Sequence, residues 1–359
     1  MMRGHHLDTR IGGHPRYAYC HEWELMQIPP EILKCVCYVE VREGSEWRLN
    51  GTAFLVGLPL TGVSRAVEGE PMAVYAVTAK HVLHHGGQTL DEDDPWWYDD
   101  ARLVLNSRSG GVEYLPVRPE LWAPHPASDT AVVRIDIPPA IDFMLWPAES
   151  YVNTEFFAKH ELTPGEEVIV TGLLWAHPGE PQITPIVRVG HVASFPIDRV
   201  NLDTGPEGAV LIEVLSFGGL SGSPAFLHLG DFRRENHGRG DLLTLDGPTG
   251  PTGGNWLLGI VQGGFEEHPT NPESARRNVG ITSVIPAARI DELLHSEQLA
   301  EERQEIVDRK NESAPKTRRA SVSVGKDEPT EFGRFEDLTG DLLKVPKKEL
   351  DDKLREDKG

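Results

Sequence analysis

The chain has 359 residues, which is long enough for two packed half-domains with additional segments. Its 56 acidic residues outnumber its 35 lysines and arginines and give a formal net charge of −21. Because nucleic acids and anionic membranes attract basic surfaces, this balance argues against both as partners.

The cysteines and the N-terminal residues indicate the cellular compartment of the protein. Cys20, Cys35 and Cys37 are odd in number, and the last two lie one residue apart in a predicted strand, a spacing that rarely suits a disulfide. We therefore expect buried free thiols. Residues 1–10 have no apolar stretch of signal-peptide length, and no segment has the apolar run needed to cross a bilayer. These features predict a cytoplasmic protein.

The N-terminal half of the chain has the pattern of short strands. Residues 1–30 are polar and are interpreted as an N-terminal arm. From residue 31 onward, short runs of β-branched, aliphatic and aromatic residues alternate with turn residues, which is typical of an all-β sandwich or barrel. The first predicted strands cover residues 33–41, 52–58, 72–78, 101–105, 113–117 and 130–137.

A second series of strands follows a predicted loop at residues 147–164. These strands cover residues 167–174, 185–195, 209–215, 224–227, 256–261 and 279–285. Two sets of about six strands predict two six-stranded antiparallel β-barrels packed side by side, over residues 31–146 and 147–297. Two polar insertions, 91–100 and 230–255, are expected as surface loops.

The C-terminal part is predicted to be helical in places. Residues 286–297 read as one helix that ends the second barrel domain, with its apolar side chains on one face. Residues 298–329 are charged and predict a flexible linker. Residues 330–359 recover an apolar period and predict an amphipathic helical tail. This tail either packs on the body or docks a regulatory protein partner.

The segment Phe217-Gly218-Gly219-Leu220-Ser221-Gly222-Ser223-Pro224 holds a serine between glycines. Taken alone, it is an ordinary turn. An acyl-transfer site, however, needs a hydroxyl on a tight turn and main-chain amides free to approach the developing oxyanion, and the flanking glycines permit that approach.

Two earlier segments supply the partners that such a serine requires. His81 follows an apolar run and is expected at the end of a strand. Asp129 directly precedes the apolar strand 130–137, which would partly bury its carboxylate. A satisfied core histidine and an aspartate turn cap are the ordinary explanations. The two residues nevertheless form a matching set with Ser221, in which His81 is the base, Asp129 is the acid that orients it and Ser221 is the nucleophile.

The segments Thr78-Ala79-Lys80-His81, Asp129-Thr130-Ala131-Val132 and Gly219-Leu220-Ser221-Gly222-Ser223-Pro224 resemble the three signatures of trypsin-like serine peptidases of the chymotrypsin fold. The resemblance covers residues 32–294. It implies a double β-barrel with His81 as general base, Asp129 orienting it and Ser221 attacking a peptide carbonyl. The amides of Gly219 and Ser221 would form the oxyanion hole.

The chain departs from the family at two positions. Many extracellular members have an acidic residue before the nucleophile that pairs with a newly cut N-terminus, and Leu220 cannot form that ion pair. Activation by cleavage is therefore not expected. Lys80 replaces the small residue common before the histidine.

The resemblance also places a substrate pocket, with its base near Leu215 and Ser216 and its walls near Gln262, Gly263, Gly264 and Gly280. No carboxylate stands at that base. An apolar or small uncharged residue before the scissile bond is therefore the hypothesis.

The predicted function is a serine endopeptidase that acts on a protein or peptide substrate without a metal or an organic cofactor. The alternative is a catalytically silent trypsin-like domain that binds peptides or proteins. An α/β-hydrolase is disfavoured, because its elbow requires a glycine where Ser223 stands. An acidic run at residues 91–94 lacks the spacing of a calcium loop and is interpreted as a solvated loop.

Overall fold

The computed structural model describes residues 29–62, 71–84, 98–195, 208–229, 232–234, 242–244, 254–267 and 277–313. The chain divides into two compact units, residues 1–313 and 314–359, and all described residues belong to the first. The predicted arm up to residue 28, Cys20, the acidic run 91–94 and the predicted tail 330–359 lie outside the described residues.

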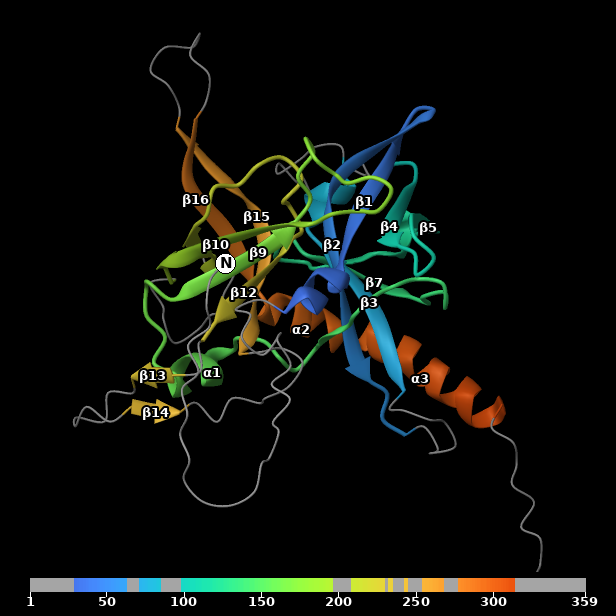
Figure 1. Cartoon of the computed structure of the whole chain (residues 1–359). Helices are drawn as coiled ribbons and strands as arrows, with labels where there is room; N and C mark the ends of the chain where they lie inside the picture. Colours follow the sequence, from blue (N-terminus) through green and yellow to red (C-terminus); the bar gives the residue numbers. More distant parts are fainter. Residues whose placement is uncertain are drawn as a thin grey trace, which may run out of the picture. The chain divides into compact units, whose positions relative to one another are not determined.

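The N-terminal half forms an eight-stranded sheet (Figure 1). Its hydrogen-bonded path runs β5-β4-β1-β2-β3-β7-β6, and β8 pairs in parallel with β2. The strands are β1 (Val36–Glu43), β2 (Glu46–Pro59), β3 (Met72–Thr78), β4 (Ala101–Asn106), β5 (Val112–Pro116), β6 (Ala123–Pro124), β7 (Ala131–Ile135) and β8 (Trp146–Pro147). Short 3₁₀ helices accompany them among the described residues: η2 (Pro30–Cys35), η3 (Lys80–Leu83) and η4 (Pro119–Leu121).

The C-terminal half forms a closed antiparallel barrel in the order β10-β11-β16-β15-β12-β9. Its strands are β9 (Glu167–Gly172), β10 (Ile186–Ser194), β11 (Val210–Glu213), β12 (Pro224–His228), β15 (Asn255–Glu267) and β16 (Arg277–Pro286). A separate hairpin of β13 (Phe232–Arg234) and β14 (Leu242–Thr244) lies within the predicted surface loop 230–255.

The two sets of strands confirm the predicted all-β architecture of the chymotrypsin-like kind. Each of the twelve predicted strands has a counterpart, and the second set closes into the predicted six-stranded barrel. The first set gains two strands of two residues each, β6 and β8, which are too short to leave a pattern in the sequence.

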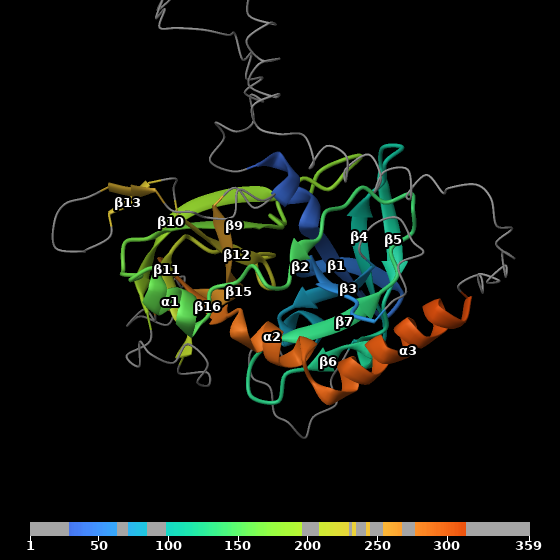
Figure 2. The same ribbon diagram turned by 90° about the horizontal axis from the view of Figure 1, so that it is seen from below.

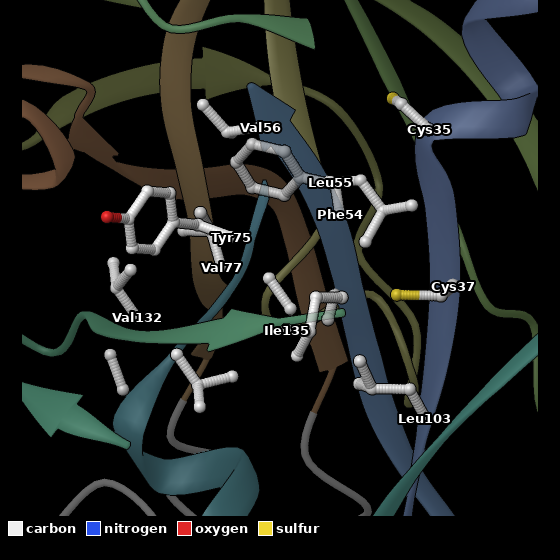
Figure 3. Packing of buried hydrophobic residues seen from close by; sticks show 14 of the residues in the cluster. Cys35, Cys37, Phe54, Leu55, Val56, Tyr75, Val77, Leu103, Val132 and Ile135 are labelled. Carbon is white, nitrogen blue, oxygen red and sulfur yellow. The ribbon is translucent and has the colours of Figure 1, made fainter. Parts of the chain in front are cut away.

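The buried side chains of the N-terminal sheet pack into a continuous apolar core (Figure 3). Phe54, Tyr75 and Leu103 come from three different strands and are fully buried. The thiols of Cys35 and Cys37 belong to this core and are free, so the predicted buried free thiols are confirmed for these two cysteines. Burial raises the pKa of the Cys35 thiol to about 12.

One helix interrupts the loop predicted at residues 147–164. Helix α1 (Thr154–Lys159) starts at Asn153, whose Oδ1 accepts a hydrogen bond from the amide of Phe156 at 2.7 Å. Asparagine before a threonine and a glutamate is a helix N-cap signal. The buried ring of Phe156 stacks on Trp256 with ring centroids 4.4 Å apart, and this contact stabilises so short a helix.

The C-terminal helices correct two predictions. The single helix expected at residues 286–297 is the shorter α2 (Ala288–Leu294), and the linker expected from residue 298 is wrong up to Ser313, because α3 (Glu297–Ser313) occupies it. Leu299 and Val307 are buried, so a narrow apolar stripe within a charged sequence is sufficient to dock α3.

Helices α2 and α3 lie along the N-terminal sheet beside β7 (Figure 2). The guanidinium of Arg303 on α3 donates to the hydroxyl of Tyr75 on β3 at 3.1 Å. Across the described residues, no helix combines the length and apolar character needed to cross a membrane.

Candidate active site

His81 and Asp129 are brought together by the pairing of β3 with β7. The two strands run antiparallel, with Thr78 at the end of β3 opposite Ala131 at the start of β7. The chain continues past Thr78 into η3, which carries His81, and it enters β7 from the loop that carries Asp129. This register therefore places the two side chains at the same edge of the sheet.

The contact between the two residues is short and shielded from solvent. His81 Nδ1 lies 2.6 Å from Asp129 Oδ2, and the main-chain amide of His81 donates to Asp129 Oδ1 at 3.0 Å. The side chains are only 11% and 7% exposed. The carboxylate that accepts from both groups fixes the ring orientation and leaves Nε2 as the ring nitrogen available for proton transfer.

Ser221 lies on the tight turn between β11 and β12. Gly219 and Gly222 have φ angles of +103° and +83°, a region that glycine enters without steric cost. The amide of Leu220 donates to the carbonyl of Phe217 at 3.2 Å, and the amide of Ser223 donates to that of Leu220 at 3.0 Å. The predicted glycine-bracketed turn is therefore a pair of consecutive tight turns with Ser221 in the second.

The serine turn lies against the strand end that leads to His81. A Cβ atom at Gly222 would clash with the carbonyl oxygen of Thr52 and with Thr78 Oγ1, and it would stand 3.2 Å from the amide nitrogen of Ala79. Ala79 is two residues before His81. The hydroxyl of Ser221 is partly exposed and donates to the carbonyl of Gln262 at 3.2 Å. All three predicted catalytic residues thus lie at one junction, with His81 and Asp129 in direct contact.

The amides of the serine turn divide into two groups. Those of Leu220, Gly222 and Ser223 donate to main-chain carbonyls. Within the described part of the chain, no main-chain carbonyl accepts from the amides of Gly219 and Ser221. These are the two amides that the resemblance to trypsin-like peptidases assigned to an oxyanion hole.

Thr52 on β2 supports this turn, although no feature of the sequence selects it. Its hydroxyl donates to the carbonyl of Gly219 at 2.7 Å and accepts from the amide of Leu173 at 2.9 Å. Its amide donates to the carbonyl of Ser221 at 2.9 Å. Thr52 is fully buried, so these bonds are shielded from water. A threonine at the start of a predicted strand carries no signal of such a role.

Asn278 connects the predicted base and walls of the substrate pocket. Its Nδ2 donates to the carbonyl of Ser216 at 2.8 Å, and its Oδ1 accepts from the amide of Gly280 at 2.8 Å. A Cβ atom at Gly264 would lie 3.1 Å from Ser216 Cβ and would clash with Asn278 Nδ2. Ser216, Gly264 and Gly280 are thus gathered around one amide side chain.

The remaining predicted pocket residues lie near this group. Leu215 is 39% exposed, and the Oε1 atom of Gln262 accepts from the hydroxyl of Ser283 at 3.1 Å. Gly263 pairs with Ser283 where a β-bulge shifts the register between β15 and β16. The sequence did not select Asn278, which lies two residues before the predicted wall residue Gly280.

Two aromatic side chains border the serine turn and were also missed. Trp175 is 54% exposed, and its ring packs so closely on Gly218 and Gly219 that a Cβ atom at either glycine would clash with it. Phe217 is 42% exposed, with the guanidinium carbon of Arg188 4.5 Å from its ring centroid. The turn is therefore flanked by exposed apolar surface.

Leu220 packs into the core of the C-terminal barrel and is 1% exposed. A buried leucine at this position stabilises the turn through packing rather than through an ion pair. Among the described residues, no group of three or more histidine, cysteine, aspartate or glutamate side chains could hold a metal ion.

Comparison with known proteins gives matches only among solved structures. No protein-family model and no curated protein matches the chain. The MamO protease domain from Magnetospirillum magneticum is 15% identical, with a TM-score of 0.39, over 74% of this chain and 99% of that one. Deg5 is 15% identical, with a TM-score of 0.37, over 75% and 89%. The thermostable serine protease AL20 is 14% identical, with a TM-score of 0.38, over 73% and 96%. Similarities at this level carry no conclusion about the activity of this chain.

Proposed function

We propose that the chain is a serine endopeptidase in which His81, Asp129 and Ser221 act as a triad. The observation that carries the proposal is the shielded 2.6 Å contact between His81 Nδ1 and Asp129 Oδ2 beside the serine turn. A histidine held in this way presents Nε2 as a general base, which is what a serine hydroxyl needs to become a nucleophile.

The reaction follows from these roles. Ser221 Oγ attacks the carbonyl carbon of the peptide bond while His81 Nε2 takes its proton. The resulting oxyanion accepts hydrogen bonds from the amides of Gly219 and Ser221. His81 then returns the proton to the leaving amine, and water hydrolyses the acyl-enzyme by the same route. No metal or organic cofactor enters this sequence.

In the structure the Ser221 hydroxyl is hydrogen-bonded to the carbonyl of Gln262. The proposal therefore requires a rotation of the Ser221 side chain toward His81 when substrate binds. Such a rotation crosses one barrier between two staggered rotamers. The hydrogen bond between a catalytic serine and its base commonly tightens only in the substrate complex.

The same hydrogen bond favours the second candidate function, a silent domain that binds peptides. A serine kept on the Gln262 carbonyl would not become a nucleophile. The two candidates differ in whether Ser221 reacts with an acylating or phosphonylating reagent.

The pocket residues support a preference for a small or apolar uncharged residue before the scissile bond. The amide of Asn278 occupies space between Ser216 and Gly264 and brings no charge. Exposed Trp175 and Phe217 add apolar surface for neighbouring substrate side chains. A peptide library that is cleaved only after lysine or arginine would contradict this preference.

The proposal places the enzyme in the reducing cytoplasm, which the free thiols of Cys35 and Cys37 support. Docking of a regulatory partner by residues 330–359 stays a prediction, since that segment lies outside the described residues.

A fluorophosphonate probe tests the function directly. Wild-type protein is expected to be labelled, and both Ser221→Ala and His81→Ala are expected to lose turnover by about 10⁴-fold or more. Ser223→Ala is the matched control. Its hydroxyl is buried in the same turn and has no hydrogen-bond partner among the described residues, so labelling should persist. Labelling that is absent from wild type, or unchanged in Ser221→Ala, would favour the silent domain.

A further inference from the structure

His125 is a buried polar residue that the proposed reaction does not use. It lies between β6 and β7, four residues before Asp129, and is 4% exposed. A buried imidazole is costly unless both ring nitrogens find partners. Both do: Nδ1 accepts from the amide of Ala127 at 3.0 Å, and Nε2 lies 2.6 Å from Glu292 Oε2. Since Nδ1 accepts, Nε2 carries the proton and donates it to the carboxylate.

Glu292 reaches His125 from α2, a part of the chain 167 residues away. Its carboxylate is fixed from the other side by Arg289, whose Nη1 donates to both oxygens at 2.7 and 3.0 Å. Burial acts to raise the pKa of the Glu292 carboxyl, but hydrogen bonds from His125 and Arg289 outweigh it and hold that pKa below its usual value. Glu292 is therefore an ionised and immobilised acceptor.

The loop that His125 begins is the one that carries Asp129. The amide of His125 donates to the carbonyl of Thr130 at 2.8 Å, which closes the loop around Asp129. Lys80, the residue before His81, donates from Nζ to the carbonyl of His125 at 2.9 Å and from its amide to the carbonyl of Asp129 at 3.3 Å. Lys80, which replaces the small residue common at this position in the family that the motifs resemble, is thus part of the same support.

From this arrangement we propose that His125 and Glu292 are positioning residues: their hydrogen bond ties the Asp129 loop to α2 and so sets the contact between Asp129 and His81. This inference rests on the proposed function of the triad. The structural reason is that a loop has few contacts of its own, whereas a misplacement of about 1 Å at a catalytic group can cost 10²-fold in rate. A hydrogen bond from the buried ring of His125 to a helix removes that freedom.

Two substitutions of His125 separate the tie to α2 from the local turn. In His125→Asn the amide oxygen can replace Nδ1 as acceptor for Ala127, but the side chain is too short to reach Glu292. In His125→Gln the amide nitrogen can replace Nε2 as donor to Glu292. Glu292→Ala removes the same hydrogen bond from the α2 side. This variant replaces His125→Asn in the test if His125→Asn fails to fold.

The control uses the other histidine–carboxylate pair of α2. His295 Nδ1 lies 3.1 Å from Asp291 Oδ1, with the histidine side chain 57% exposed and no bond to the Asp129 loop. His295→Asn removes this pair from the same helix without touching the site.

Peptidase kinetics should show a fall in kcat of about 10- to 100-fold for His125→Asn with KM little changed. His125→Gln should stay within about threefold of wild type, and His295→Asn should equal it. Combining His125→Asn with Glu292→Ala should cost no further kcat, because both remove one hydrogen bond.

A spectroscopic signal reports on the hydrogen bond between His81 and Asp129 without any measurement of turnover. The proton between His81 Nδ1 and Asp129 should give a far-downfield proton NMR resonance that is absent in His81→Ala. We expect this resonance to be lost or shifted in His125→Asn and retained in His125→Gln.

Unchanged kcat and resonance in folded His125→Asn, with wild type active, would overturn the positioning role and leave the proposed function standing. A kcat loss that merely tracks the unfolded fraction, with the resonance unchanged, would also overturn it. A wild-type chain that neither cleaves peptides nor takes the probe would overturn the proposed function and, with it, this role.

Discussion

At the scale of residues, the candidate site depends as much on the supporting side chains as on the triad. The two hydrogen bonds between His81 and Asp129 fix the base. Two hydrogen bonds from Thr52, to the carbonyls of Gly219 and Ser221, fix the serine turn from the facing sheet. The Gly219 carbonyl that Thr52 holds belongs to the peptide unit between Gly219 and Leu220, directly before Ser221, so releasing it would let the turn around Ser221 reorient.

Thr52→Val should therefore impair catalysis beyond its effect on stability. The change keeps the shape of the side chain but leaves the Gly219 carbonyl and the Leu173 amide without their partner, at a cost of about 2–4 kcal/mol in the free energy of unfolding. We expect kcat to fall about 10²-fold if the turn moves and its amides no longer face the developing oxyanion. Thr52→Ser keeps the hydroxyl and should stay near wild type.

Kinetics and thermal melts of both variants check this prediction. A Thr52→Val protein that melts lower but keeps its kcat would mean that Thr52 serves only stability.

At the scale of elements, the sequence was most informative where the local pattern and the fold agree. Strand β3 was predicted with its exact bounds because β-branched and aromatic residues fill it between turn signals. The serine, histidine and aspartate segments could be selected because each follows or precedes such a strand. Thr52 and the His125–Glu292 pair could not, because their partners are 121 to 167 residues away and only the tertiary structure reveals them.

Helix α3 was missed for a different physical reason. Its sequence is dominated by charged residues, and Leu299 and Val307 alone are deeply buried along its seventeen residues. Such a stripe cannot stabilise an isolated helix, and the helix exists because the sheet offers a surface to pack on. Composition alone predicted a linker at that position.

The boundary of the folded unit should accordingly lie at Ser313 rather than near residue 297. A chain that ends at residue 297 loses the burial of Leu299 and Val307 and the bond from Arg303 to Tyr75, together worth about 3–5 kcal/mol. We expect its melting temperature to fall by about 10 °C.

A chain that ends at Ser313 is the matched control and should melt as the full chain does, because residues 314–359 form a separate unit. Calorimetry of the two truncations decides between the boundaries. Equal melting of both would show that α3 adds nothing to stability.

At the scale of the whole first unit, the two β-structures share one core. The ring of Trp146 on β8 stacks on Phe226 on β12 with centroids 4.4 Å apart, and both side chains are fully buried. Leu173 and Ile260 of the C-terminal half belong to the same apolar cluster as the N-terminal sheet. A shared core of this kind holds the two halves in one fixed relative position, which a site assembled from both halves requires.

The relative position of the two halves is most critical at Gly222. A methyl group there would meet Thr52 and Thr78 of the N-terminal sheet, so Gly222→Ala should push the serine turn away from His81. We expect both the rate of fluorophosphonate labelling and kcat to fall by about 10²-fold or more, since small displacements are costly at a catalytic site. The melting temperature should fall as well.

Gly110→Ala separates the steric effect from backbone strain. Gly110 has a φ of +91°, close to the +83° of Gly222, but a methyl group there would meet nothing within 4 Å. It should cost only the strain of the left-handed backbone, about 1 kcal/mol, and leave kcat unchanged. Labelling rates and melts of the two variants side by side measure the difference, which is the contribution of contact between the halves. Equal behaviour of the two alanine variants would mean that the close approach at Gly222 does not set the geometry of the site.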